Sequence, residues 1–254
     1  IKYFSRADGL TDSYINQVTQ DSTGFIWIGT RNGLFRYDGY EFTGYFSVSN
    51  DNKSIPGNDI TSVYYDPKGK LWLGTNNGVC YYNPDSDNFT RISDFQQQNE
   101  SLIISCITSD KQGTIYVSIY QTIFRFNEKA QHFKQAVTTE GMEVNTFLFD
   151  NENNLWVGCA ENGGLFRSSF KKENDELHLK AGSVENVIKG VSINSLGYDG
   201  KRIWAATSTS GIRMYDTGTG QTVQYSYNNS AEARASRIFV DKRKNVWAVD
   251  YAGL

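Results

Sequence analysis

All five tryptophans of this chain occupy the same position of a repeating unit, and this periodicity restricts the possible folds more than any other feature. Each tryptophan lies between two apolar residues, and a tyrosine fills the only gap in the series. The anchors are Trp27, Trp72, Tyr116, Trp156, Trp204 and Trp247, separated by 45, 44, 40, 48 and 43 residues. Repeats of this length are typical of arrays in which each unit forms one small sheet.

The rest of the unit repeats as well. An aspartate precedes five of the anchors by six residues and the fifth anchor by five, and a turn sequence follows it. These aspartates are Asp21, Asp66, Asp110, Asp150, Asp199 and Asp241. Glycine and asparagine in the turns tolerate the positive φ of tight hairpins, so each unit is expected to begin with strand, hairpin and strand.

Two further strands are expected in each unit, for example at 33–37 and 41–46 in the first repeat. Four antiparallel strands in about 44 residues match a propeller blade. We therefore predict an all-β fold, a β-propeller of four-stranded antiparallel blades with about five and a half blades present, in a single partial domain over residues 1–254. The blade repeats are expected at 12–57, 58–99, 100–141, 142–189, 190–233 and 234–254, with a ring-closing outer strand at 1–6.

Composition agrees with a globular β protein, since 39% of the residues are hydrophobic and only three are prolines. The formal net charge of -3 gives no electrostatic reason to expect contact with nucleic acid. Cys80, Cys106 and Cys159 form no CxxC pair, so we expect small core residues rather than a zinc site or a redox pair.

Two charged segments have plain structural explanations. Residues 150–154 superficially resemble a calcium loop but lack its glycine and its distal glutamate, and they fall where every repeat has its hairpin. A turn is expected there, and we predict no metal site and no cofactor. Residues 171–176 carry mixed charges in the longest repeat and are expected to form a solvated outer loop.

Asp8–Asn16 and Asp21–Phe42 resemble the two-component regulator propeller repeat. The match is strong in the first two repeats and weaker in the third, fifth and sixth, where the aromatic-apolar-glycine signature is replaced, for example by Tyr116-Val117-Ser118. The resemblance implies the periplasmic sensor region of a Bacteroides-type hybrid two-component histidine kinase. It also implies a seven-bladed propeller, of which this chain would be a slice of a longer polypeptide.

The same resemblance implies a function. The ligand would be an oligosaccharide released from glycans, and the signal would pass across the membrane to a histidine kinase outside this segment. The other expected partners are the remaining blades and the downstream sensor domains of the same polypeptide, with a homodimer in the full-length form. No kinase loop, phosphate-binding glycine motif or phosphoacceptor histidine is found in these residues, so this segment itself is predicted not to be an enzyme and to have no catalytic residues.

Two alternatives remain open. The first is a structural or dimer-forming propeller whose ligand is bound elsewhere. The second is a lyase or hydrolase propeller, because antibiotic-inactivating lyases share a related propeller but use a histidine-centred site with metal. The two histidines here, His132 and His178, fall in outer-strand regions of their repeats, which disfavours an imidazole base near the propeller axis.

Candidate ligand-binding residues follow from the strand order, because loops between the second and third strands and before the first strand emerge on one face. Amides, carboxylates, arginine and tyrosine in these loops suit sugar hydroxyls, acidic groups and apolar ring faces. The candidates are Tyr14, Arg31, Asn76, Tyr120, Glu161 and Tyr251. Asn32 and Asn77 precede glycines and are expected in turns, and the recurring Asn16, Asn145 and Asn194 are expected to cap backbone groups. The tryptophan anchors are expected to be core wedges between neighbouring blades.

Overall fold

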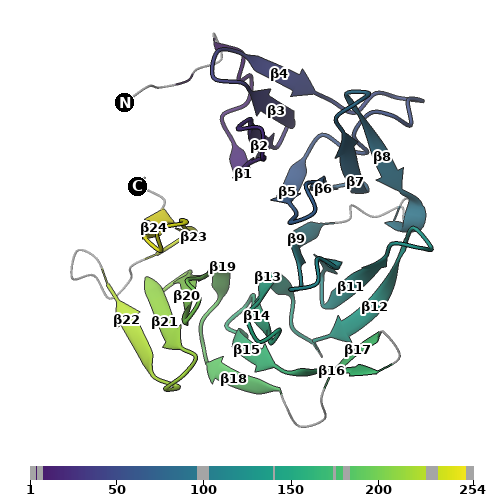
Figure 1. Cartoon of the computed structure of the whole chain (residues 1–254). Helices are drawn as coiled ribbons and strands as arrows, with labels where there is room; N and C mark the ends of the chain where they lie inside the picture. Colours follow the sequence, from purple (N-terminus) through teal and green to yellow (C-terminus); the bar gives the residue numbers. More distant parts are fainter. Residues whose placement is uncertain are drawn as a thin grey trace. The chain divides into compact units, whose positions relative to one another are not determined.

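The computed structural model describes residues 4, 8–95, 103–139, 141–173, 176–179, 184–226 and 234–249. These residues form two compact units. Unit 1 comprises Ile1–Ser109, Gly113–Ile119 and Arg125–Lys134, and unit 2 comprises Asp110–Gln112, Tyr120–Phe124 and Gln135–Leu254. Each unit is built from consecutive small antiparallel sheets, whose strands are labelled in Figure 1.

Unit 1 contains two complete four-stranded sheets. The first has the order β1-β2-β3-β4, made of β1 (Ile15–Gln20), β2 (Ile26–Thr30), β3 (Gly33–Tyr37) and β4 (Phe42–Tyr45). The second has the order β5-β6-β7-β8, made of β5 (Ile60–Tyr65), β6 (Leu71–Thr75), β7 (Gly78–Asn83) and β8 (Asn88–Ile92), and the short 3-10 helix η2 (Ser93–Phe95) follows it. The third sheet, whose residues are divided between the two units, consists of β9 (Ile104–Ser109), β10 (Ile115–Ile119), β11 (Thr122–Asn127) and β12 (His132–Thr138).

Unit 2 contains two further four-stranded sheets and two two-stranded ones. The fourth sheet consists of β13 (Val144–Phe149), β14 (Leu155–Cys159), β15 (Gly164–Ser168) and β18 (Glu185–Ile188). The fifth consists of β19 (Ile193–Tyr198), β20 (Arg202–Thr207), β21 (Ile212–Asp216) and β22 (Thr222–Tyr225). The two-stranded sheets are β16 (Phe170–Glu173) with β17 (Glu176–Leu179), and β23 (Arg237–Val240) with β24 (Val246–Val249). This series of four-stranded antiparallel sheets confirms the predicted all-β class.

Several expectations need correction. The segment at 171–176 was expected to be a loop, but β16 and β17 form a two-stranded sheet inserted before β18. Trp247 was expected to be buried, yet its exposed fraction is 52%, because β23 and β24 pair only with each other among the described strands. Of the outer strand expected at 1–6, only Phe4 lies within the described residues, and it is not in a strand.

The repeated aspartate fixes the hairpin and the anchor together. In the second sheet, Oδ1 of Asp66 accepts the backbone N–H groups of Lys68 and Lys70 at 2.9 and 2.8 Å, and Oδ2 accepts the indole N–H of Trp72 at 2.9 Å. The same indole bond is made to Asp21, Asp150, Asp199 and Asp241 at 2.8, 2.9, 2.9 and 3.1 Å. The regular spacing of aspartate and tryptophan is therefore explained by one carboxylate that closes the hairpin and also accepts the indole N–H of the anchor.

These carboxylates predict a loss of stability in acid. Hydrogen bonds from Asn245 and Trp247 lower the pKa of Asp241 below its ordinary value of 3.8. At Asp199, burial raises the pKa, but hydrogen bonds from Trp204 and from two backbone N–H groups outweigh it, so the net shift is also downward. A carboxyl group whose pKa is lower in the folded chain than in the unfolded chain stabilises the fold fully when the pH is above its unfolded-state pKa. This stabilisation is lost as the pH falls through its folded-state pKa.

We therefore expect the midpoint temperature of unfolding to be nearly constant from about pH 7 to about pH 5 and to fall below about pH 4. Calorimetric scans of the protein across this range measure the effect. Asp199→Asn should give a shallower acid slope, because it removes one of the titrating carboxyls. An acid slope identical to that of the parent would show that this carboxyl contributes nothing.

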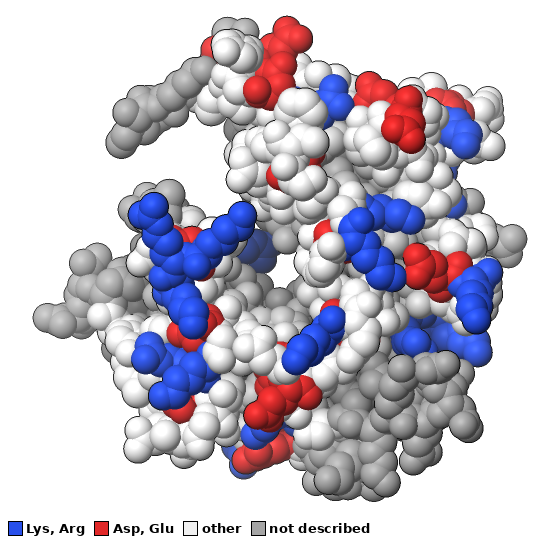
Figure 2. Space-filling model, viewed as in Figure 1, with Lys and Arg blue, Asp and Glu red and all other residues white. Residues whose placement is uncertain are grey.

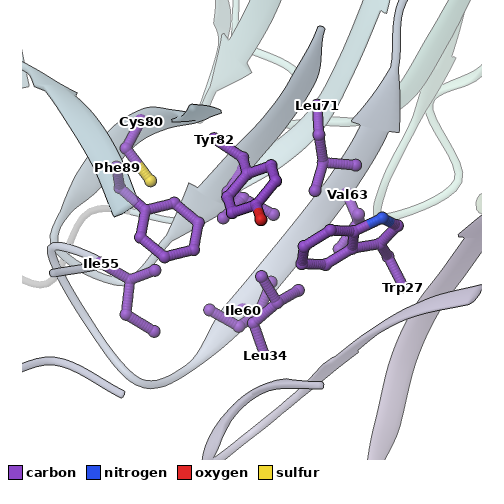
Figure 3. Packing of buried hydrophobic residues seen from close by; sticks show 10 residues of the cluster. Trp27, Leu34, Ile55, Ile60, Val63, Leu71, Cys80, Tyr82 and Phe89 are labelled. Atoms are coloured by element: carbon purple, nitrogen blue, oxygen red, sulfur yellow. The ribbon is translucent and has the colours of Figure 1, made fainter. Parts of the chain in front are cut away.

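Neighbouring sheets pack through aromatic anchors. The core between the first and second sheets includes Trp27, Leu34, Ile60, Val63 and Tyr82, whose side chains converge in Figure 3. The ring centroid of Trp27 lies 4.8 Å from that of Tyr82 in the next sheet. The equivalent contacts join Trp72 to Phe126 at 5.1 Å and Trp156 to Tyr215 at 5.3 Å. Trp27, Trp72, Tyr116 and Trp156 are at most 2% exposed.

The glycine two residues after the anchor lies where neighbouring sheets come closest. A Cβ on Gly158 of β14 would lie 2.6 Å from Cγ2 and 2.8 Å from Cβ of Ile193 in β19. In the fifth sheet Ala206 takes the equivalent place, and Gly197 on the paired strand lies against Ile238 instead, with a distance of 2.7 Å from its added Cβ to Cγ2. The residue at this position is accordingly small in these sheets: it is glycine at 29, 74 and 158, serine at 118 and alanine at 206.

Asparagine side chains in the first strand of a sheet donate hydrogen bonds to backbone carbonyls at or just before the start of the following sheet. A β-bulge near the start of β1 shifts the register between Ile15 and Gln17, at Asn16, and equivalent shifts recur in β5, β13 and β19. The amides of Asn16, Asn145 and Asn194 donate to the carbonyls of Ile60, Ile193 and Ala235 at 2.9, 3.0 and 2.9 Å. These bonds supply partners to carbonyls at or just before the start of the next first strand, in agreement with the predicted backbone capping. Thr61, at the same offset, makes no such bond, and its buried hydroxyl has no partner.

Candidate ligand-binding loops

The same backbone hydrogen bond joins two loops in four of the sheets. The N–H of the residue four positions after the anchor donates to the C=O of the residue that precedes the first strand. The pairs are Arg31 to Tyr14, Asn76 to Asp59, Ala160 to Glu143 and Ser208 to Ser192, at 3.2, 3.0, 2.9 and 3.1 Å. The backbone is thus constant while the side chains differ, which is the arrangement of binding loops on a rigid scaffold.

Tyr14 and Arg31 form an exposed pair in unit 1. The guanidinium carbon of Arg31 lies 4.4 Å from the centroid of the Tyr14 ring, a cation–π contact. Tyr14 is 62% exposed, and its N–H donates to Oδ1 of Asp12 at 3.0 Å. The sequence identified both residues as candidates, and the structure brings them together.

Asp59 and Asn76 occupy the equivalent loops of the second sheet. The amide of Asn16 donates to Oδ1 of Asp59 at 3.1 Å, so it links the first-sheet loops to the second-sheet loops within unit 1. Oδ1 of Asn76 is buried without a hydrogen-bond partner, and it lies so close to Gly57 that a Cβ there would approach it to 2.2 Å. Asn76 therefore offers less to a ligand than its sequence position suggested.

The other candidates lie in unit 2 or outside the described residues. The carbonyl of Tyr120 accepts the N–H of Val144 at 2.7 Å, and Tyr120 is 43% exposed. Glu161 is exposed in the β14–β15 turn with a φ of 48°. Tyr251 falls outside the described residues. Among the described candidates, Tyr14 and Arg31 are in contact. The described candidates are not shown to form a single binding site.

Turn residues account for other polar loop positions. Gly33 and Gly78 have φ values of 115° and 123°, as expected after Asn32 and Asn77. A buried threonine at the end of the second strand fixes these turns, because the Thr30 hydroxyl donates to the Gly33 carbonyl at 2.8 Å and accepts the Asn32 N–H at 3.1 Å. Thr75 and Thr207 make the same donor bonds to Gly78 and Gly211. Our sequence reasoning missed this threonine, although its recurrence was visible.

The histidine and cysteine side chains of the described part of the chain do not form a metal-binding cluster. His132 begins β12, an edge strand of its sheet, and its Nδ1 lies 3.0 Å from the carbonyl of Phe133. No group of three histidine, cysteine, aspartate or glutamate side chains that could hold a metal ion is found among the described residues. Cys80, Cys106 and Cys159 are free thiols, and burial raises the pKa of the Cys159 thiol to about 11.

Charged side chains of both signs cover the face seen in Figure 2, and basic ones gather over β23 and β24. The turn between these strands contributes the three consecutive exposed cations Lys242–Lys244. A net charge of -3 for the whole chain conceals this local concentration. Within the described residues, no helix is long and apolar enough to cross a membrane.

Comparison with known proteins adds the fold and the repeat type. The chain is 24% identical, with a TM-score of 0.62, to the extracellular domain of a putative hybrid two component system from B. thetaiotaomicron, covering 97% of this chain and 40% of that one. It also resembles a virginiamycin B lyase from Staphylococcus aureus at 14% identity and a TM-score of 0.71, covering 96% of this chain and 80% of the lyase. These likenesses support a β-propeller fold.

The matches found by sequence comparison cover shorter segments than the structural ones. Over 54 residues the chain is 41% identical to Histidine kinase P4 of Formosa agariphila, which is 21% of this chain and 4% of that protein. The chain thus spans a small part of that relative and about two fifths of the hybrid-system domain. The family model described as two component regulator propeller matches residues 9–32 and 54–77. On these two repeats, the resemblance of this chain to the two-component regulator propeller family is confirmed.

Proposed function

We propose that this chain is a periplasmic ligand-binding propeller of a hybrid two-component sensor, which recognises an oligosaccharide and passes the signal to a histidine kinase in the same polypeptide. One observation carries the proposal. Each matched regulator repeat, 9–32 and 54–77, contains both loop positions of one constant backbone bond, and these positions hold Tyr14 with Arg31 and Asp59 with Asn76. The repeat thus presents variable polar side chains on a fixed frame.

The chemistry of these loops suits a sugar. Tyr14 offers an exposed flat ring to the apolar face of a pyranose, and Arg31 and Asp59 supply donors and acceptors to hydroxyl groups. Signalling requires a further property of the ligand. It must bind one conformation of the sensor more tightly than another, because only a difference in affinity shifts their populations.

The test is calorimetric titration of the full-length protein with a panel of neutral and acidic oligosaccharides. Tyr14→Ala in unit 1 and Tyr120→Ala in unit 2 are titrated in parallel, with Tyr40→Ala as the matched control because Tyr40 is 92% exposed on the β3–β4 turn. We expect saturable binding without product, weakened about tenfold by Tyr14→Ala, as loss of a stacking contact with a ring would give.

Other outcomes identify the alternatives. Binding that survives both substitutions would favour a propeller that is a scaffold or a dimer interface, with the ligand bound elsewhere. A product that accumulates during the titration, and that depends on His132 or on added metal, would favour a lyase or hydrolase. If no oligosaccharide of the panel binds, the proposed sugar-sensing function is wrong.

A further inference from the structure

Arg31 is the feature of unit 1 that the fold itself does not explain. The equivalent positions of other sheets hold Asn76, Ala160 and Ser208, and all of them make the same backbone bond. The frame therefore needs the N–H at this position and not the guanidinium group. An arginine that is dispensable for the frame is free to serve recognition.

Arg31 has no acidic partner among the described residues. Two other arginines of unit 1 have polar partners: Arg36 lies 3.4 Å from Oδ1 of Asp87, and Arg91 donates four hydrogen bonds to the loop at 51–55. Within the described residues, Arg31 forms no ion pair, and its side-chain contact is the ring of Tyr14. It therefore presents an uncompensated positive charge to solvent.

The residue before the first strand is not buried in the described four-stranded sheets: Tyr14 and Ile103 are exposed, and Asp59, Glu143 and Ser192 are partly exposed. Ile103 precedes β9 as Tyr14 precedes β1, and Ile103 is 44% exposed although β9 packs against β5 and β6. The residues that packing between sheets would cover are different ones, because Ile60 and Val63 of β5 are at most 1% exposed. Packing of a sheet against β1 therefore does not require Tyr14 to be covered.

The contact with Tyr14 leaves the N–H donors of Arg31 available, since its side chain forms no hydrogen bond among the described residues. A planar guanidinium lying over an aromatic ring keeps its in-plane N–H groups free, and these form the fork that matches a carboxylate or a sulfate through two parallel hydrogen bonds. Asp59 accepts a hydrogen bond from the amide of Asn16, two residues after Tyr14, and provides carboxylate oxygens that can accept hydrogen bonds from sugar hydroxyls. An anionic sugar residue is thus favoured at Arg31, with neutral hydroxyls toward Asp59.

We propose that the Tyr14–Arg31 pair is an acid-specific subsite, which selects oligosaccharides that carry a carboxylate or a sulfate group. This inference rests on the proposed function and narrows its ligand class. Tyr14 contacts the sugar ring, and Arg31 pairs with the anionic substituent.

Matched ligands test the proposal on the full-length protein. One arm titrates a uronic acid oligosaccharide and its methyl-esterified form, and a second arm titrates a sulfated oligosaccharide and its desulfated form. We expect the neutral form of the preferred ligand to bind about tenfold or more weakly, as for a lost charge-assisted hydrogen bond. The arm with the larger difference identifies the anion. Raising the salt concentration should weaken only the charged form.

Variants separate charge from geometry. Arg31→Ala should weaken the acidic ligand about tenfold or more and abolish its preference over the neutral form, while Arg31→Lys should retain part of the preference because it keeps the charge without the fork. Arg243→Ala, a change of an exposed arginine in unit 2, is the matched control. Equal binding of charged and neutral forms, unaffected by Arg31→Ala, would overturn the acid-specific subsite while leaving sugar recognition intact. Absence of binding to every sugar would overturn both.

Discussion

Gly74→Val is expected to lower the free energy of unfolding by about 3 kcal/mol, near the upper end of the usual cost of overpacking a core. The added Cβ would lie 2.6 Å from Cγ2 and 2.7 Å from Cβ of Ile104, and 3.4 Å from Cβ of Ser62. The Cβ of Ile104 is attached to the backbone of β9, so rotation of its side chain cannot relieve the overlap. The strands β6 and β9 would have to move apart, which would loosen the packing between the second and third sheets.

Urea unfolding of the protein, followed by tryptophan fluorescence, measures this change. Gly218→Ala is the matched control, because the closest atom to its added Cβ is Oδ1 of Asp216 at 3.5 Å and the residue is exposed. We expect the control to alter the free energy of unfolding by less than about 0.5 kcal/mol. A Gly74→Val protein as stable as the parent would mean that this glycine does not set the separation of the two sheets.

Asp66→Ala is expected to destabilise the protein by about 3 kcal/mol, because several hydrogen-bond donors lose their acceptor at once. The carboxylate of Asp66, a residue only 4% exposed, accepts the N–H groups of Lys68 and Lys70 and the indole N–H of Trp72. Water has little access to the indole N–H, since Trp72 is 2% exposed. The hairpin between β5 and β6 would lose its closure, and the anchor would lose its orientation.

The same unfolding experiment compares three variants. Asp66→Asn retains one acceptor oxygen for the backbone groups but turns an amide donor toward Trp72, so an intermediate loss of stability is expected. Asp85→Ala, which removes an exposed carboxylate from the β7–β8 turn, is expected to be neutral within about 0.5 kcal/mol. Equal stability of Asp66→Ala and Asp85→Ala would contradict the proposed role of the repeated aspartate.

The fold was accessible from the sequence because its signals are local and recur. The anchor, the aspartate and the turn lie within a few residues of one another, and each of β2, β6, β10, β14, β20 and β24 contains its predicted anchor. Prediction was wrong where the local pattern ended. Nothing in the charged run at 171–176 indicated that β16 and β17 would pair, and the burial of Trp247 depends on neighbouring strands that its own sequence does not specify.

The candidate site was accessible only in part. The predicted strand order placed Tyr14 and Arg31 in loops on one face of the repeats. It gave no reason to pair them, and it treated Asn76 as an equal candidate, although its side-chain oxygen is buried against Gly57. Whether a loop residue can bind a ligand depends on the exposure and the contacts of its side chain. Neither property follows from the predicted strand order.

The sequence by itself determined the strands, the turns and the repeat type, because alternating apolar residues, turn-forming glycines and a hairpin-closing aspartate act over short distances along the chain. The tertiary structure decided which repeats touch and through which atoms. Asn16 and Ile60 are 44 residues apart, and their bond exists because a β-bulge in β1 aims one amide at the next sheet. The contact of Arg31 with Tyr14 likewise depends on two loops that one backbone hydrogen bond brings together. Such contacts arise from packing between separate segments, for which a single sequence carries no local signal.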